Sequence, residues 1–192
     1  MNQWEPPVDN EQIAVFQAIA EAINRATNLP TSIWVLDKRR QALRIAASIG
    51  LPASYARQAF LSLDEPSVTG EAFKTGEVAM AHDILSDPRW KYKQEAQEMG
   101  WKAALCVPFK VRGAVMGVIS IYTFVRREFT ELERHLLSDY AAQIGLTFEA
   151  EVTRRTLLRL LEVGQQIEKA ITRQPKIVLE EAHIGFEVKW RN

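Results

Sequence analysis

The sequence predicts an α+β fold, in which a central antiparallel sheet of about five or six strands is flanked by helices and followed by a long C-terminal helix. Two observations lead to this prediction. Runs rich in apolar and β-branched residues come in neighbouring pairs joined by short links, as the strands of hairpins do. Apolar residues at spacings of three and four mark a helix near the start of the chain and another after the second strand pair.

The first half of the chain predicts a helix, a hairpin and a short capped helix. In order, the elements are a helix over 10–27, strands over 31–36 and 43–48, a helix over 68–75 and a brief strand over 77–81. The first helix carries an apolar stripe that includes Phe16 and Ile23, and the Asn-Leu-Pro segment 28–30 ends it. The polar link 37–41 fits a hairpin connection. Gly76 fits the left-handed position that follows a helix end.

The second half predicts another helix, a second hairpin and the long helix. In order, the elements are a helix over 88–99, strands over 103–110 and 115–124, and a helix from 131 to about 172. Asp87 and Pro88 predict the start of the first of these helices, since Asp is a good N-cap and Pro fits the first helical position. Gly117 predicts a strand site where another group packs closely against the backbone. Thr130 followed by Glu133 fits a capping box at the start of the long helix.

The long helix changes character along its length, and this change predicts the domain organisation. Its first half has a broad apolar face suited to a sheet, whereas its second half has a narrower stripe near heptad spacing. We therefore expect a homodimer whose helical seam contains Leu157, Leu161, Ile167 and Ile171. The predicted parts are a folded domain over 1–150, a helical signalling linker or coiled-coil extension over 151–174, and a tail or truncated start of a further element over 175–192.

The composition excludes several classes of protein. The 192 residues include 24 Lys or Arg and 24 Asp or Glu, so the chain lacks the net positive charge typical of a nucleic-acid-binding protein. No apolar run reaches the roughly 18 residues of a membrane-spanning helix, so no membrane partner is expected. The N-terminal segment has neither the basic start nor the apolar core of a secretory signal, so a cytoplasmic protein is expected. The single cysteine, Cys106, excludes an intramolecular disulfide framework.

Six segments of the chain carry a resemblance to a known family. In order, they are residues 31–37, 68–76, 83–89, 104–109, 113–122 and 129–133. With these segments spread over residues 10–150, the chain resembles a GAF domain, the small-molecule-sensing module of bacterial signalling proteins and phosphodiesterases. The resemblance implies a pocket between one sheet face and the loops and short helices above it. By that resemblance, the candidate pocket residues are Trp34, Asp83, Trp90, Tyr92, Ser120 and Tyr122.

The resemblance leaves the ligand open, because members of the family bind different ligands or none. Bilin-binding members attach their chromophore through a cysteine commonly followed by histidine, whereas Val107 follows Cys106 here. Members that reduce methionine sulfoxide use several cysteines, and one thiol cannot close that cycle within a chain. Cyclic-nucleotide-binding members carry an Asn-Lys pair followed by Phe and then Asp-Glu; only Phe129 and Glu133 fit, and the capping box explains them equally well. His82 fits either an ordinary loop histidine or a haem or metal ligand.

The sequence therefore predicts a regulatory domain rather than an enzyme, and it assigns no cofactor. In the main hypothesis, a dimeric GAF domain senses a small molecule and relays the signal through its terminal helices to a kinase, cyclase, phosphatase or second GAF domain. The alternative is a ligand-free dimerisation or interaction module whose pocket is filled by its own side chains. Asp83 fits either a hydrogen bond to a ligand amine or a cap on local backbone, and the aromatic residues fit either ligand stacking or core packing.

Overall fold

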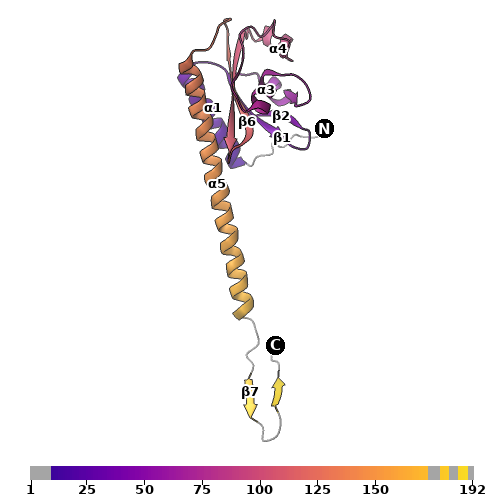
Figure 1. Cartoon of the computed structure of the whole chain (residues 1–192), viewed down its shortest axis with the longest axis vertical. Helices are drawn as coiled ribbons and strands as arrows, with labels where there is room; N and C mark the ends of the chain where they lie inside the picture. The colour runs from indigo at the N-terminus through magenta and orange to yellow at the C-terminus, as the bar shows by residue number, and fades with distance from the viewer. Residues whose placement is uncertain (1–9, 173–177, 182–185, 190–192) are drawn as a thin grey trace. The chain divides into compact units, whose positions relative to one another are not determined.

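The computed structural model describes residues 10–172, 178–181 and 186–189 of the chain. The chain forms two compact units, Met1–Glu149 and Ala150–Asn192. The first unit contains a sheet and the helices that cover it, and Figure 1 shows the order of these elements.

The first unit is built on a six-stranded sheet in the order β3-β2-β1-β6-β5-β4, and every neighbouring pair is antiparallel. The strands are β1 (Thr31–Asp37), β2 (Ala42–Ile49), β3 (Phe60–Ser62), β4 (Ala79–Ala81), β5 (Ala103–Val111) and β6 (Ala114–Thr123). The hairpins β1-β2 and β5-β6 meet at the centre, where Thr31 pairs with Ile121 and Val35 pairs with Gly117. The predicted antiparallel sheet with flanking helices is confirmed.

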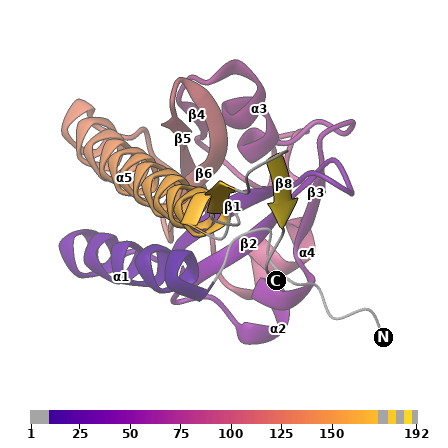
Figure 2. The ribbon, with the colours of Figure 1, turned by 90° about the horizontal axis from the view of Figure 1, so that it is seen from below.

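Helices cover both faces of this sheet (Figure 2). They are α1 (Asn10–Thr27), α2 (Ala53–Gln58), α3 (Val68–Thr75), α4 (Lys93–Glu98) and α5 (Glu131–Thr172). Within the first unit, α1 and the start of α5 lie side by side on one face, whereas α2, α3 and α4 lie over the other. The sheet is therefore buried on both sides, which explains why its strands are almost continuously apolar.

The period of two along a strand separates two cores. Ile33 and Val35 of β1 belong to one core, and Trp34 between them belongs to the other. We call the first the helix face; its buried residues include Phe16, Ile33, Leu105, Phe109, Ile119, Ile121, Leu137, Ile144 and Phe148. We call the second the aromatic face; its buried residues include Trp34, Tyr55, Leu61, Val68, Trp90, Trp101, Cys106 and Tyr122.

Two backbone positions shape the β5-β6 hairpin. Arg112 and Gly113 have φ values of 52° and 80°, so both central turn residues are left-handed, as a tight two-residue hairpin requires. A side chain at Gly117 would collide with the backbone oxygen of Trp34 and the ring of Phe109. The prediction that another group packs closely on Gly117 is therefore confirmed.

The capping box at the start of α5 is also formed as predicted. The Glu133 backbone N–H donates to Oγ1 of Thr130 at 3.3 Å, and the Thr130 N–H donates to Oε2 of Glu133 at 2.9 Å. Arg127 adds two hydrogen bonds to the Glu133 carboxylate, at 2.8 and 2.6 Å. Because Arg127 stabilises the charged form, the pKa of Glu133 falls to about 2. The start of α5 is thus stabilised both by the capping-box hydrogen bonds and by the ion pair between Arg127 and Glu133.

The helix predicted over 88–99 is wrong in its first half. Oδ1 of Asp87 accepts a hydrogen bond from the backbone N–H of Arg89 at 2.9 Å, which makes a local turn rather than a helix cap. Tyr92 is then held by Phe60, whose N–H and C=O each bond the Tyr92 hydroxyl at 2.7 Å. Tertiary contacts thus keep 88–92 irregular, and α4 begins only at Lys93. Neither α2 nor β3 was predicted from the sequence.

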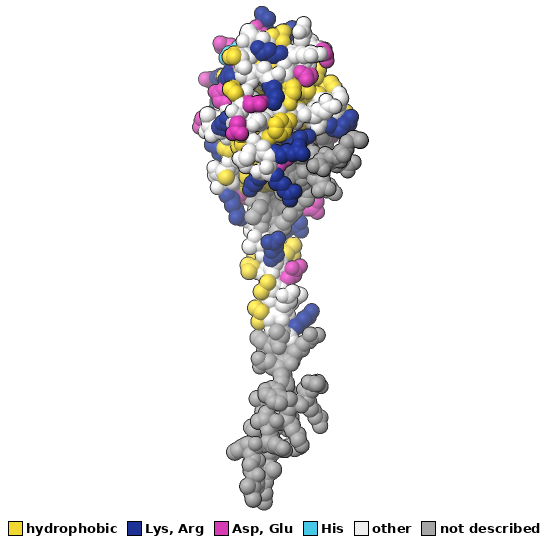
Figure 3. Space-filling model, turned by 90° about the vertical axis from the view of Figure 1, so that its right-hand side faces the viewer, with side chains coloured by type: hydrophobic (Ala, Val, Ile, Leu, Met, Phe, Trp, Pro, Cys, Tyr) yellow, Lys and Arg dark blue, Asp and Glu magenta, His cyan; other side chains and the backbone are white. Residues whose placement is uncertain are grey.

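In the second unit, the structure describes the rest of α5 and a hairpin of β7 (Val178–Glu181) and β8 (Phe186–Lys189). The predicted tail over 175–192 lies partly outside the described residues. Leu157, Leu161 and Ile167 are exposed in the single chain, and Figure 3 shows exposed hydrophobic side chains along this helix. The side chain of Ile171 lies outside the described residues. Within the described part of the chain, no helix combines the length and apolarity needed to cross a membrane.

Candidate functional site

The aromatic face carries a cluster of packed rings. Trp101 stacks on Tyr122 with ring centroids 4.1 Å apart, and Trp90 meets Tyr122 edge-on at 6.1 Å. Tyr55 makes edge contacts with Tyr92 and Trp101, each at 5.5 Å. Such pairs add stability beyond the burial of their area, so the rings hold one another in defined orientations.

A small cavity lies at the edge of this cluster, and we call it the aromatic cavity. Its lining residues are Trp34, Tyr55, Leu61, Ser67, Val68, Thr69, Arg89, Trp90, Lys91, Tyr92 and Tyr122. Its volume is about 20 Å³. A water molecule needs roughly 10–15 Å³, so the cavity has room for about one. Ser67 and residues 89–92 of its lining belong to two segments, 63–67 and 86–92, that contain no helix or strand; we call these the covering segments.

The buried hydroxyls of the aromatic face bond mainly to one another. The Tyr122 hydroxyl and Oγ of Ser32 are 2.7 Å apart, and the Trp34 indole N–H donates to the same Oγ at 2.9 Å. Sγ of Cys106 lies 3.3 Å from Oγ of Ser120. Burial raises the pKa of the Cys106 thiol and of the Tyr122 hydroxyl. Both groups are therefore neutral at ordinary pH.

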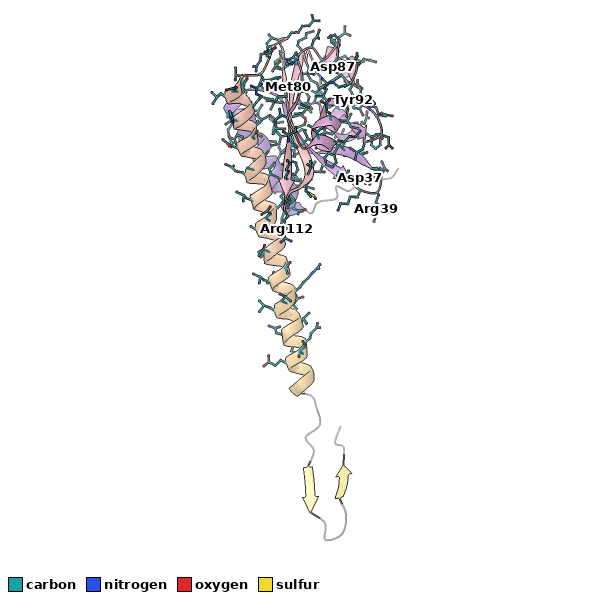
Figure 4. The ribbon with its side chains drawn as sticks, viewed as in Figure 1. Asp37, Arg39, Met80, Asp87, Tyr92 and Arg112 are labelled. Atoms are coloured by element: carbon teal, nitrogen blue, oxygen red, sulfur yellow. The ribbon has the colours of Figure 1, made fainter. Side chains whose placement is uncertain are left out.

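The charged groups at the rim of the cavity are paired with one another. Arg89 donates to both carboxylate oxygens of Asp87, at 3.0 and 2.6 Å, to Glu71 at 2.5 Å and to the backbone oxygen of Met80 at 2.9 Å. Figure 4 shows Met80 and Asp87 at the same end of the domain as Tyr92. The hydrogen bonds from Arg89 lower the pKa of Asp87, so this carboxylate stays charged to low pH.

Trp90 differs from the other polar groups of the aromatic face. Its side chain is buried, with 9% exposure, and its Nε1 has no hydrogen-bond partner in the part of the chain that the structure describes. A buried N–H without a partner is costly, and in native proteins it calls for an explanation such as a bound water or ligand. Lys91, next in the chain, is held by Glu65 at 2.9 Å.

The sequence model of the GAF domain family matches residues 10–149. The chain belongs to the GAF domain family. GAF domains are typical of signalling sensor proteins. A comparison with curated protein sequences finds no match.

Solved structures with the same fold include GAF domains and related enzymes. The GAF domain of a phosphoenolpyruvate-protein phosphotransferase from Coxiella burnetii is 17% identical, with a TM-score of 0.66 over 78% of this chain and 88% of that one. A domain of a protein described as a two-component sensor histidine kinase from Sinorhizobium meliloti 1021 is 22% identical, with a TM-score of 0.60 over 77% and 98%. A free methionine-R-sulfoxide reductase from Neisseria meningitidis is 19% identical, with a TM-score of 0.65 over 76% and 83%.

These neighbours place the GAF fold in two settings. The first two proteins are named as a phosphotransferase and a sensor kinase, in which the GAF domain is one part of a larger protein. The third is named as an enzyme in its own right, in complex with its substrate. At these identities the likeness shows the fold alone.

The predicted pocket residues fall into two groups in the structure. Trp34, Trp90, Tyr92 and Tyr122 come together around the aromatic cavity. Ser120 is fully buried beside Cys106, and the residues that line the cavity do not include it.

Asp83 also lies apart from the aromatic cavity. Its carboxylate forms an ion pair with Arg126 at 3.1 Å and accepts a hydrogen bond from the backbone N–H of Leu85 at 3.3 Å. The second contact is the local backbone cap that the sequence left open as an alternative for this residue. His82 and His135 are exposed, and among the described residues no group of His, Cys, Asp and Glu is arranged to hold a metal ion.

The sequence did not predict seven of the residues that line the cavity. They are Tyr55, Leu61, Ser67, Val68, Thr69, Arg89 and Lys91. Ser67 has a signal in the sequence, because it is the N-cap of α3 and its Oγ accepts from the Gly70 N–H at 2.9 Å. The position of Arg89 carries no such signal, because its partners Glu71 and Met80 belong to distant elements.

A larger surface hollow of about 570 Å³ lies on the helix face of the GAF domain. It is lined by the α3-β4 turn, the β5-β6 hairpin and the first part of α5, with Val107, Lys110, Ala141, Ala142 and Leu146 among its residues. Near it, the Arg112 N–H donates to Oε1 of Glu149 at 2.6 Å, and Figure 4 shows Arg112 next to α5. A side chain at Gly145 would collide with the backbone oxygen of Lys110, so α5 needs glycine here to pack on β5.

Proposed function

We propose that this GAF domain senses a small molecule at the aromatic cavity and relays the binding event through α5. Two features of the cavity support the proposal. Aromatic side chains line it, and part of its lining comes from the covering segments 63–67 and 86–92, which contain no helix or strand. Ligand sites are typically apolar hollows with a few polar groups, and segments without regular structure open more easily than packed helices. The ligand would enter by displacing this cover.

A route from the cavity to α5 runs through the sheet. Tyr122 lines the cavity, whereas its neighbour Ile121 packs in the core that α5 covers. On β1, Trp34 likewise lines the cavity, and its neighbour Ile33 packs in the core on the opposite face. A ligand that moves Tyr122 or Trp34 would therefore shift residues that support α5. Such a shift transmits a signal only if α5 has two arrangements and the ligand binds the domain more tightly in one of them than in the other.

The proposed relay ends in a dimer and an output domain. Leu157, Leu161 and Ile167 are more than half exposed in the single chain, as residues of an open helical seam would be. The output would be a kinase, cyclase, phosphatase or second GAF domain, in the same protein or in a partner. We assign the domain a regulatory role rather than a catalytic one, since its single cysteine is buried and cannot form a disulfide within the chain.

A specific observation also supports the alternative of a ligand-free interaction module. The aromatic cavity measures only about 20 Å³, so its own side chains nearly fill it. In that case the rings of the aromatic face serve as core, and the domain acts through its helices alone.

Thermal shift with a panel of compounds separates the two functions. The panel contains cyclic nucleotides, bilins, amino acids and uncharged heterocycles. A sensor predicts a saturable rise in melting temperature with at least one class, because binding to the folded state alone stabilises it. Val68→Leu adds one methylene to the cavity lining and should abolish that rise, whereas the matched Val35→Leu on the helix face should keep it. No response to any class would support the interaction module.

Sedimentation velocity tests the dimer. The double variant Leu157→Glu, Leu161→Glu should be monomeric if the seam lies along the second half of α5. Leu132→Glu is the control, because Leu132 is an even more exposed leucine near the start of the same helix. A double variant that stays dimeric would place the interface elsewhere.

A further inference from the structure

One hydrogen-bond donor in the lining of the aromatic cavity has no acceptor among the described residues. Trp90 is more than nine-tenths buried, it lines the cavity, and its Nε1 has no partner among the described residues. An indole N–H can only donate, so whatever satisfies it must supply a lone pair. The cavity beside it is the space from which such an acceptor can come.

The neighbouring hydroxyls add further donors. Oγ of Ser67 already accepts from the Gly70 N–H, so its own proton is available to donate. Burial raises the pKa of Tyr55 well above its usual value, so its hydroxyl keeps its proton and remains a donor. Both residues line the cavity, so their hydroxyls are further donors that a ligand there could use.

The cations at the rim are already paired with carboxylates of this chain. Arg89 is held by Asp87 and Glu71, and it donates a further hydrogen bond to the backbone oxygen of Met80. Lys91 forms an ion pair with Glu65 at 2.9 Å. An anion entering the cavity would lose its water and would have to compete with these carboxylates for a cation, and burying an incompletely paired charge is unfavourable. A cation would have to compete for the carboxylates in the same way.

The walls set the shape and polarity of the ligand. The rings of Trp34, Tyr55, Trp90, Tyr92 and Tyr122 surround the cavity, and edge contacts hold Trp90 against Tyr122. Aromatic walls favour a flat apolar body, because its faces and edges find matching partners. A ligand that satisfies both the donor and the walls must therefore carry a hydrogen-bond acceptor on a flat, apolar body.

We infer that the aromatic cavity takes a small, flat, uncharged molecule that offers a carbonyl or ring-nitrogen acceptor to the indole N–H of Trp90. This inference rests on the proposed function, because the cover must open to admit more than one water molecule. It narrows that function by excluding free carboxylates and phosphates as ligands of this site.

Three simple probes of the same size test the inference on the full chain. Benzamide is uncharged and carries a carbonyl acceptor, benzoate carries a negative charge, and toluene has no acceptor. Binding is followed by two-dimensional NMR of protein labelled with ¹⁵N at tryptophan, in which each indole N–H gives its own resonance. Trp90→Phe identifies the Trp90 resonance by its disappearance and removes the donor while keeping an aromatic ring.

The expected result has three parts. Benzamide moves the Trp90 indole resonance downfield and saturably, as a new hydrogen bond should. Benzoate binds at least about tenfold more weakly than benzamide, since its charge finds no free partner. Trp90→Phe weakens benzamide at least about fivefold and leaves toluene within about twofold, because only benzamide uses the donor.

Other results would overturn the inference. Equal affinity for benzoate and benzamide would show that charge is accepted, and this comparison needs no variant if Trp90→Phe fails to fold. Unchanged benzamide affinity in Trp90→Phe would show that the indole N–H is not used. A tightly held water at Trp90 that no probe displaces would mean that water alone satisfies the donor.

The two proposals fail in different ways. If no probe binds and the thermal-shift panel is also silent, the proposed sensing function fails. If an anionic panel compound stabilises the domain and Val68→Leu removes that effect, the sensing function stands and the inference of an uncharged ligand fails.

Discussion

The two faces of the sheet differ in the types of side chain that they bury. The helix face consists of aliphatic and phenylalanine side chains, such as the stacked rings of Phe16 and Phe148, whose centroids are 5.0 Å apart. The aromatic face combines tryptophan and tyrosine rings with buried hydroxyls, a thiol and an indole N–H without a partner. One face is therefore satisfied by packing alone, whereas the other keeps polar groups that packing does not satisfy.

This difference shows how one sheet can serve as scaffold and as site. The helix face gains its stability from apolar burial, which needs no partner from outside the domain. On the aromatic face, the buried indole N–H of Trp90 has no acceptor among the described residues, which lowers stability unless an acceptor arrives. Substitutions on the two faces should therefore have different consequences, and the following predictions test this contrast in order of decreasing effect.

Phe109→Ala should produce the largest loss. Phe109 is 1% exposed and contacts Phe16 with ring centroids 5.8 Å apart, so truncation leaves a cavity in the helix face. We expect the free energy of unfolding to fall by about 3–5 kcal/mol. Urea denaturation followed by circular dichroism measures it. A loss below about 1 kcal/mol would show that the helix face is not the main source of stability.

Gly117→Ala should destabilise the domain by an intermediate amount. The added methyl group would meet the backbone oxygen of Trp34 and the ring of Phe109, neither of which has room to retreat. Overpacking of this kind costs about 1–3 kcal/mol. Gly113→Ala is a useful comparison, because a side chain there meets nothing within 4 Å and only the φ of 80° is unfavourable. An unchanged melting temperature in Gly117→Ala would contradict the close approach of β1, β5 and β6.

Tyr122→Phe should be much milder than Phe109→Ala, although both rings are 1% exposed. The change removes the hydroxyl that lies 2.7 Å from Oγ of Ser32, but that Oγ still accepts from Trp34. We expect a loss of about 1 kcal/mol in the free energy of unfolding. The same denaturation experiment compares the two variants. An equal loss in the free energy of unfolding for Tyr122→Phe and Phe109→Ala would contradict the proposed difference between the two faces.

Glu133→Gln should have the smallest effect at neutral pH and a distinctive pH dependence. Gln still accepts the hydrogen bond from the Thr130 N–H but loses the ion pair with Arg127, whose side chain is 29% exposed. We expect a loss of about 0.5–1 kcal/mol at pH 7.

The sign of the pH effect follows from the lowered pKa of Glu133. Its value is about 2 in the folded state against 4.5 normally, so its contribution is present above pH 4.5 and disappears as the pH falls toward 2. Denaturation at several pH values should therefore show the wild type and Glu133→Gln converging near pH 2. A constant difference between them across this range would argue against the lowered pKa.

Much of the fold was predictable from local signals. The first helix, both hairpins and the capping box of α5 follow from apolar spacing, turn residues and the Thr130–Glu133 pair, all of which act within a few residues of one another. The helix expected from Asp87-Pro88 was wrong, because Asp87 bonds Arg89 and Tyr92 is held by Phe60. The first contact is a local turn that competes with a helix cap, whereas the second joins residues 32 positions apart and leaves no trace in the local sequence.

The site was predictable only in part. The resemblance to GAF domains pointed to Trp34, Trp90, Tyr92 and Tyr122, which line the cavity. It could not show that Arg89 is fully engaged by its neighbours, or that the Trp90 indole lacks a partner. Both properties depend on the arrangement of side chains in three dimensions, and the proposed ligand class rests on them.

Hydrogen–deuterium exchange of the full chain tests the central claim most directly. The chain is compared with and without the panel compound that raises its melting temperature most. We predict slower exchange in the covering segments 63–67 and 86–92, with a smaller change in the part of α5 that packs on the sheet. Slower exchange confined to α1 and the hollow lined by Val107, Lys110 and Ala142 would contradict the claim, because it would place the ligand on the helix face.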